Sequence, residues 1–448
     1  MELVTKVPET RLNVPVAIIG AGPSGLAAAQ SLMSAGIDFA LVDKGQEVNY
    51  RERNDPKDIV EGVGGSGLFS DGKFSFYPSA TNLWNLSPTH NLLDAYTWFI
   101  NLLVDHGADL TSRSFPHINR INYKYFSCES EGHVIHKLYD SIKMALPNRM
   151  AIIKELWEPL GYRTLLGYHL VNISELSSAS IELTLKHIGH ECTPISSLTS
   201  LRCEHLLIAG GRYSPQLLRR ILPGSFMAFR RWEYGIRIEQ PADSFFLSSF
   251  DQIDPKLIIP STNDHPEYRT FCCCRDGEIV STRSYELLSI SGRSNGDPTG
   301  KSNIGFLVRF KNQILDKAFT DFLAISSSLS QPNAFPLAML LSGTSSESND
   351  LEIVNSTFGE ILSAPLVRGL KIMLSQYPLL AQRDTILYMP AIEGLGYYPA
   401  VSSDLRIPDT NIWVAGDASG LFRGLTAAFI SGWFAGRNIS DAIENDHE

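Results

Sequence analysis

The chain has 448 residues, of which 44% are hydrophobic, and a formal net charge of −10 at pH 7. A chain of this length buries a sizeable core, and its acidic balance without a basic run excludes nucleic acid and an anionic membrane surface as expected partners. No apolar run is long enough to span a bilayer and the first residues lack the apolar core of a signal peptide, so we expect a cytoplasmic protein with no integral membrane segment.

The first element is a buried strand that leads through a glycine-rich turn into a helix, over residues 16–35. The glycines have the spacing G-x-G-x-x-G. The first permits a tight turn, the second lets the backbone approach a pyrophosphate, and the third lets the helix pack closely on the strand. Free N–H groups at the helix N-terminus then face the phosphates. We predict that this turn binds a dinucleotide through Gly20, Ala21, Gly22, Pro23, Ser24 and Gly25.

A second parallel strand is predicted over residues 39–43, after the helix ends at Ala35 and Gly36. Its last residue, Asp43, is placed to accept hydrogen bonds from ribose hydroxyls, with Lys44 beside it. A glycine-rich turn in an ordinary α/β protein is the alternative. The order strand, glycines, helix, strand and acid is much more specific than the glycines alone and favours the dinucleotide site.

Residues 61–73 contain five glycines, which disfavour the interior of a helix or a strand. Such a segment lets the backbone lie against a flat or anionic ligand, and a flexible surface loop is the alternative. Leu68, Phe69 and Phe74 are too apolar for a solvated linker, so we favour the ligand. The predicted cofactor contacts here are Gly64, Gly65, Ser66, Ser70 and Asp71.

Residues 411–436 indicate a buried strand, then Gly416 and Asp417, then a helix with a face of small residues suited to close packing on another helix. With residues 62–73, 234–239 and 270–277, this segment makes the chain resemble the FAD-dependent dehydrogenase group of the NAD(P)/FAD-dependent oxidoreductases. The resemblance implies FAD in a fold of the glutathione-reductase type. It implies that Gly416 and Asp417 bind the ribityl chain, that Gly424 and Leu425 begin a helix aimed at the flavin, and that Ala209, Gly210 and Val171 complete the site.

The predicted fold class is α/β, with a Rossmann-like FAD-binding domain built on a parallel sheet and interleaved with a mixed α+β substrate domain. We expect the discontinuous FAD-binding domain at residues 1–80, 150–222 and 395–448, a helical insertion at 81–149, and a substrate or cap domain with a mixed sheet at 223–394. The serine-rich residues 325–331 are expected to form a loop.

The sequence has neither a C-x-x-x-x-C pair after the second strand nor a second complete G-x-G-x-x-G unit, which argues against a disulfide reductase and a dedicated NAD(P)H domain. We therefore predict an FAD-dependent oxidoreductase that transfers hydride to or from a small organic substrate bound over the flavin, with NAD(P)H as a candidate transient electron donor. A flavin-dependent monooxygenase and a non-catalytic FAD-binding scaffold remain alternatives. The oligomeric state stays open.

Four candidate catalytic residues follow: Lys73, Glu393, Tyr397 and Arg423. The lysine would bond near flavin N5 or stabilise an anionic substrate. The arginine would steer a carboxylate or compensate charge on the reduced flavin, and the tyrosine would serve as an acid or as part of the pocket wall. A surface lysine, a surface salt bridge and a core aromatic are the structural alternatives. Cys272, Cys273 and Cys274 are expected to be reduced structural thiols rather than a redox relay, and no Cys/His cluster has zinc spacing, so no metal is predicted.

Overall fold

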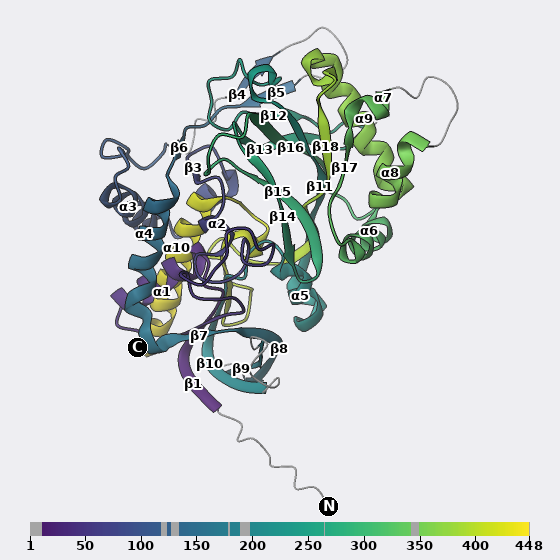
Figure 1. The fold of residues 1–448 in the computed structure, drawn as a ribbon. Helices are drawn as coiled ribbons and strands as arrows, with labels where there is room; N and C mark the ends of the chain where they lie inside the picture. The colour runs from purple at the N-terminus through teal and green to yellow at the C-terminus, as the bar shows by residue number, and fades with distance from the viewer. Residues whose placement is uncertain are drawn as a thin grey trace, which may run out of the picture.

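The computed structural model describes residues 11–117, 123–126, 134–177, 180–188, 198–263, 265–341 and 349–447. The chain forms two lobes, and each lobe is built around its own sheet (Figure 1). Residues of both lobes line one cavity. The lower lobe in Figure 1 contains both the first strand and the last helix of the chain, so segments far apart in sequence share one core.

The sheet of the first lobe has seven strands in the order β7-β2-β1-β10-β9-β8, with β19 also paired to β10. Its parallel part joins β7, β2, β1, β10 and β19, and β8 and β9 are antiparallel to their neighbours. The strands are β1 (Arg11–Ile19), β2 (Phe39–Asp43), β7 (Thr164–Leu166), β8 (Tyr168–Ser177), β9 (Ser180–His187), β10 (Leu198–Ile208) and β19 (Ile412–Val414). This sheet is the predicted Rossmann-like unit, and the strand predicted at 39–43 is confirmed.

Two helices pack tightly against each other in this lobe, α1 (Pro23–Ser34) and α10 (Leu425–His447). A Cβ atom added at Gly432 would lie 2.1 Å from the carbonyl oxygen of Ser24, and one at Gly436 would lie 2.9 Å from that of Ala28. The predicted close packing of the small-residue face is therefore confirmed. The remaining helices of this region are α3 (Thr89–Asp105), α4 (Leu146–Trp157) and α5 (Ser214–Ile221).

The second lobe contains an eight-stranded sheet in the order β17-β18-β11-β16-β13-β12-β5-β4. Every pair is antiparallel, so the sheet that was predicted to be mixed is an antiparallel one. Its strands are β4 (Tyr123–Phe126), β5 (Val134–Lys137), β11 (Met227–Pro241), β12 (Lys256–Ile259), β13 (Glu267–Cys274), β16 (Lys301–Phe310), β17 (Asn333–Pro336) and β18 (Ile386–Pro399). The strands β14 (Glu278–Ser284) and β15 (Leu287–Arg293) form a separate hairpin, and β15 contacts β18 of this sheet. A second two-stranded sheet joins β3 (Lys73–Ser75) and β6 (Ser141–Lys143).

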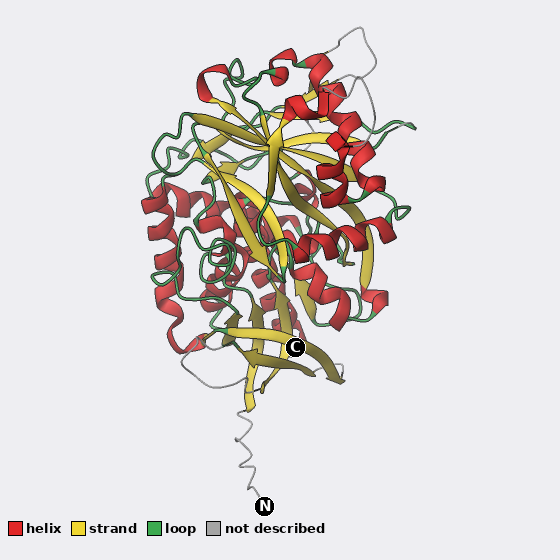
Figure 2. Ribbon diagram, turned by 45° about the vertical axis from the view of Figure 1, so that its right-hand side comes forward, coloured by secondary structure: helices red, strands yellow, loops and turns green. Residues whose placement is uncertain are grey.

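One face of the second sheet is covered by helices, which gather on one side of the strands in Figure 2. Fully buried Tyr234, Phe306, Phe319 and Phe322 form the core between sheet and helices. The other face is left for the cavity. The covering helices are α6 (Asp316–Ser328), α7 (Leu337–Leu341), α8 (Asn349–Phe358) and α9 (Glu360–Gln376).

Three local expectations differ from the structure. The segment 81–149 contains α3 but also the strands β4, β5 and β6, two of which extend the second sheet; residues 118–122 and 127–133 lie outside the described part. The serine-rich stretch, expected to be a loop, continues α6 to Ser328, and the hydroxyls of Ser327 and Ser328 donate to the carbonyls of Leu323 and Ile325 in the preceding turn. A one-turn helix, α2 (Gly65–Leu68), interrupts the glycine-rich segment. Within the described residues, no helix is long and apolar enough to cross a membrane.

Candidate active site

A cavity of about 940 Å³ lies between the lobes and is lined from both of them. At one end are the glycine-rich turn after β1 and the end of β2. At the other are the free face of the second sheet and the cysteine segment of β13. The volume is near the upper end of the range for ligand sites, which suits a dinucleotide together with a second, small molecule.

The turn after β1 brings the backbone of the first lobe to the cavity. Gly20 has φ +111°, and a Cβ atom at Gly25 would lie 1.8 Å from the Gly20 carbonyl oxygen, so both positions require glycine. Gly22 is the N-cap of α1 and no side chain caps the helix. The first N–H groups of α1 are therefore available to a phosphate at the cavity wall.

Asp43 holds this turn together. Its carboxylate accepts the N–H of Ala21 at 2.7 Å, that of Gly45 at 2.8 Å and that of Gly62 at 3.0 Å. Asp43, which is predicted to bind the ribose, therefore connects the nucleotide turn to the glycine-rich segment. It also lines the cavity. Lys44 lies beside it, paired with Glu61 at 2.5 Å and 3.8 Å from the centre of the Tyr285 ring.

The glycine-rich segment is fixed by an arginine that the sequence analysis missed. The guanidinium of Arg51 is buried and donates to the carbonyls of Asp58, Val63 and Gly65. Burial lowers the pKa of Arg51 to about 10. Gly64 and Gly65 have φ +87° and +52°, which lets the chain turn back beneath α1.

Two residues of the cavity lining from different segments, Tyr213 before α5 and Thr426 in α10, have polar groups without partners. The hydroxyls of Thr426 and Tyr213 are buried, and no described residue bonds them. Asp417 also lines the cavity, and its burial raises the pKa of its carboxyl group. Buried polar atoms without partners are rare in folded proteins, so these atoms fit a polar group of a bound cofactor.

A charged group connects the two lobes near Gly424. The carboxylate of Glu393 is buried and contacts both Arg212 and Arg423. Deeper in the same wall, Glu233 pairs with Arg231 at 3.0 Å and with Arg309 at 2.7 Å. Although burial opposes ionisation, these arginines hold the pKa of Glu233 well below its usual range.

Lys73 lies in a second charged group, between the glycine-rich segment and the second sheet. Its ammonium is 2.5 Å from Asp71 and 3.4 Å from Asp254, and it donates to the Cys273 carbonyl. Although burial opposes the charge, Asp254, then Cys274 and Cys272, and then Asp71 raise the pKa of Lys73 well above its ordinary value. Tyr139 donates to Asp254 at 2.9 Å and completes the group.

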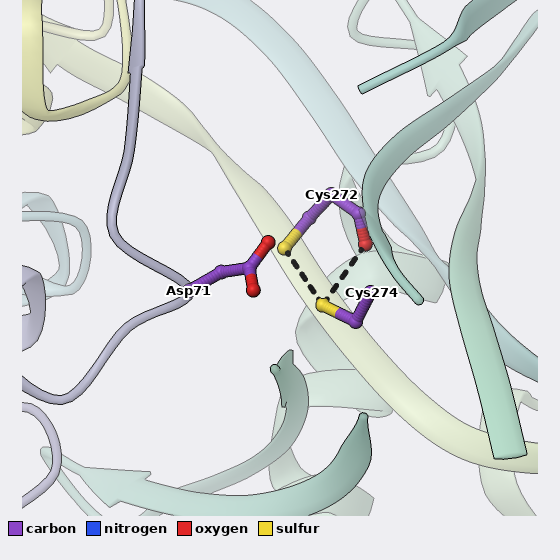
Figure 3. A group of neighbouring side chains, drawn as sticks. All are labelled: Asp71, Cys272 and Cys274. Atoms are coloured by element: carbon purple, nitrogen blue, oxygen red, sulfur yellow. Dashed lines mark hydrogen bonds between the residues drawn. The ribbon is translucent and has the colours of Figure 1, made fainter. Parts of the chain in front are cut away.

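Two of the three consecutive cysteines face Asp71 (Figure 3). The sulfurs of Cys272 and Cys274 are 3.7 Å apart, and Arg237 lies 3.5 Å from the Cys274 sulfur. The thiol of Cys274, with help from Lys73 and Arg237, lowers the pKa of Cys272. The three ligand atoms are close enough together for a metal ion, but the two adjacent cations make the place unfavourable for one.

Most of the predicted site residues line this cavity, namely Gly20, Gly22, Pro23, Ser24, Asp43, Lys44, Gly65, Ser66, Ser70, Asp71, Lys73, Ala209, Gly210, Glu393, Asp417, Arg423, Gly424 and Leu425. The cavity lining omits Ala21, Gly25, Gly64 and Gly416, which shape its walls from behind. Val171, inside β8, is 38% exposed and lies outside the lining; the first three residues of the same strand, Tyr168, His169 and Leu170, line the cavity instead.

Tyr397 also lies outside the cavity. Its hydroxyl donates to Asp316 at the start of α6, and its ring packs on Phe229. Tyr397 therefore belongs to the packing of the second lobe. The lining also includes residues that the sequence analysis did not single out: Arg212, Arg231, Glu233, Lys137, Lys256, Arg269, Arg309, Tyr139 and Asp254. For Arg269, the sequence did contain a signal: the charged residues Glu267 and Arg269 alternate with other residues over 267–271, which predicts a strand with one charged face.

Residues 13–55 match the family model of the FAD binding domain. This stretch contains β1 from residue 13 onward, the nucleotide turn, α1 and β2, and therefore the uncapped helix and Asp43. This match identifies FAD as the cofactor. Comparison of the sequence with curated proteins gives no match.

Among solved structures, the chain is similar to a flavoprotein/dehydrogenase from Cytophaga hutchinsonii, with 12% identity and a TM-score of 0.44 over 97% of this chain and 79% of that one. It is also similar to a geranylgeranyl bacteriochlorophyll reductase-like protein from Thermoplasma acidophilum, with 13% identity and a TM-score of 0.43 over 98% and 80% of the two chains.

Proposed function

We propose that the chain catalyses hydride transfer between FAD and a small organic substrate that binds at the second-sheet end of the cavity. One observation carries the proposal: a single cavity runs from the nucleotide turn to a wall of charged side chains on another lobe. FAD, when bound, supplies the acceptor or donor of the hydride. We also propose that residues 1–80, 150–222 and 395–448 act as its binding domain, with NAD(P)H as a transient donor.

The chain's own residues support binding and orientation. The uncapped N-terminus of α1 and the backbone of Gly20 and Gly22 would hold the pyrophosphate, and the unpartnered hydroxyls of Thr426 and Tyr213 offer further contacts. Lys73, fixed by Asp71 and Asp254, would present one ammonium group to the region between cofactor and substrate. Two carboxylates fix it, so it serves as a positioned cation rather than a proton donor.

Arg423 would act near the start of α10. Glu393 holds it together with Arg212, so the guanidinium is kept at the cavity wall beside Gly424. A positive charge at that position complements negative charge that develops on a reduced ring system. Tyr397 has no part in this proposal, because its hydroxyl is bonded to Asp316 outside the cavity.

Anaerobic reduction tests the proposal. The purified holoprotein is mixed with NADH, with NADPH and with a panel of small organic acids and alcohols, while the flavin absorbance is followed. Bleaching by at least one of these compounds is expected, and Arg423→Met should slow it at least tenfold. A protein that holds FAD but is bleached by none of them, and whose chemically reduced flavin is not reoxidised by any organic acceptor in the panel, would contradict hydride transfer.

A further inference from the structure

The free face of the second sheet forms one wall of the cavity. Along β13, Glu267, Arg269 and Phe271 line the cavity, whereas Tyr268 between them is fully buried on the helix side. The same alternation continues on the neighbouring strands, so that charged side chains from four more strands point to one space. The charged residues of this wall are Lys137, Arg231, Glu233, Lys256, Glu267, Arg269, Arg309 and Lys311.

Two lysines on this wall stand directly opposite each other. Lys137 of β5 and Lys256 of β12 are cross-strand partners in the antiparallel register. Like charges in this arrangement destabilise a sheet. Lys137 donates to the Thr81 hydroxyl at 2.7 Å, whereas the ammonium group of Lys256 has no hydrogen-bond or ion-pair partner among the described residues. The pair of Lys137 and Lys256 therefore destabilises the sheet, and no acidic partner of Lys256 among the described residues compensates for it.

The acidic groups nearby are already engaged. Glu267 pairs with Arg269 at 2.8 Å and with Lys311 at 3.1 Å, and Glu233 serves Arg231 and Arg309. Asp254, the acid beside Lys256 in sequence, bonds Tyr139 and Lys73. Positive charge is thus in excess on this wall.

The titration of the two lysines agrees with that excess. Burial, followed by the charges of Arg269 and Arg309, lowers the pKa of Lys137 to about 8. The same causes lower the pKa of Lys256 well below its ordinary value, with Asp254 opposing. A bound anion would reverse this effect, because an opposite charge within a few ångströms favours the ammonium form.

We propose that Lys137, Lys256 and Arg269 form the binding site for an oxyanion group of the substrate, so that the substrate is an organic anion. Ile135, Ile258 and Leu307 line the wall beside the charges and leave room for an apolar body next to the anionic group. The inference rests on the proposed function in one respect: it takes the ligand of this wall to be the substrate of the flavin.

Titration calorimetry of the holoprotein with matched probes tests the inference. Benzoate and succinate are the anionic probes, and benzamide and succinamide are their neutral counterparts. At least one anion is expected to bind, and its amide should bind at least tenfold more weakly, because a charge-assisted hydrogen bond is worth about one to two decades in affinity. If no anion binds, or if each amide binds as well as its acid, the inference is overturned.

Variants locate the binding. Lys256→Gln should weaken the anion at least tenfold and should raise the melting temperature, because it removes the repulsion with Lys137. A lysine that merely supports the fold would lower the melting temperature on substitution. Lys137→Gln is the second variant, in case the first does not fold. The control is Lys317→Gln, an exposed lysine paired with Asp321 on α6, which should change neither quantity.

The same samples separate this inference from the proposed function. Their FAD content is measured, and flavin-free protein is titrated alongside. Anion binding that depends on Lys256 in a protein whose flavin no compound reduces would uphold the anion site and refute hydride transfer. A flavin that is reduced in the wild type, with anion affinity unchanged in Lys256→Gln and Lys137→Gln, would refute the anion site alone.

Discussion

Substitution of Gly25 by alanine tests how the nucleotide turn binds FAD. The added Cβ would lie 1.8 Å from the carbonyl oxygen of Gly20, whereas carbon–oxygen contacts normally begin at about 3.3 Å. The start of α1 must then retreat by about 1.5 Å from the turn. Hydrogen bonds tolerate only a few tenths of an ångström in donor–acceptor distance. The N–H groups that face the pyrophosphate would therefore lose their hydrogen bonds to it.

The magnitude follows from the bonds at risk. Loss of two hydrogen bonds to a charged group costs about 3 kcal/mol or more, which is more than a hundredfold in the Kd for FAD. The overpacked turn should also destabilise the fold by about 1–3 kcal/mol. Both are measured on deflavinated protein, the first by flavin fluorescence on titration with FAD and the second by urea unfolding.

The matched control is Gly224→Ala, because a Cβ at that glycine meets nothing within 4 Å and needs no unusual backbone angle. It should bind FAD like the wild type and unfold within about 0.5 kcal/mol of it. If Gly25→Ala holds FAD within threefold of the wild-type affinity, the reasoning about the turn is refuted.

Three further predictions concern the charged groups. Glu393→Gln leaves Arg212 and Arg423 without their carboxylate and should lower the melting temperature by several degrees in thermal unfolding; an unchanged value would show that the pair is not formed. The pKa of Glu233 is depressed in the folded protein, so its stabilisation is present above the ordinary carboxyl pKa of 4.5 and is lost as the pH falls through the folded value. Glu233→Gln should therefore flatten the fall of stability with acid measured by urea unfolding between pH 7 and 3, and an equally steep fall would contradict the assignment. Iodoacetamide at pH 7 should modify Cys272 before Cys203, because burial raises the pKa of Cys203 to about 12 while Cys274 lowers the pKa of Cys272. Peptide mass spectrometry measures the order of modification, and Cys274→Ala should slow the reaction at Cys272.

The sequence predicted the cofactor half of this protein well, since that half is encoded by local rules. A turn that needs φ +111° at Gly20 and no side chain at Gly25 leaves a glycine spacing that can be read directly. The small residues of α10 likewise report contact with α1. These features depend on backbone geometry within one unit of the fold.

The second lobe was predicted less well, because its wall depends on long-range pairing. Lys137 and Lys256 become neighbours only through the register of β5 and β12, which are more than a hundred residues apart in the chain. Alternation shows that a strand has two faces but does not say which one meets the cavity. Arg51 shows no pattern at all: its role follows from three carbonyls that only the folded loop directs at it.

The most direct test of the account is FAD binding by the purified, deflavinated protein, with riboflavin as the comparison. The account predicts one FAD per chain, and at least hundredfold weaker binding of riboflavin, because riboflavin lacks the pyrophosphate that the N-terminus of α1 and the turn at Gly20 and Gly22 would hold. A protein that binds no FAD, or that binds riboflavin equally well, would contradict the central claim.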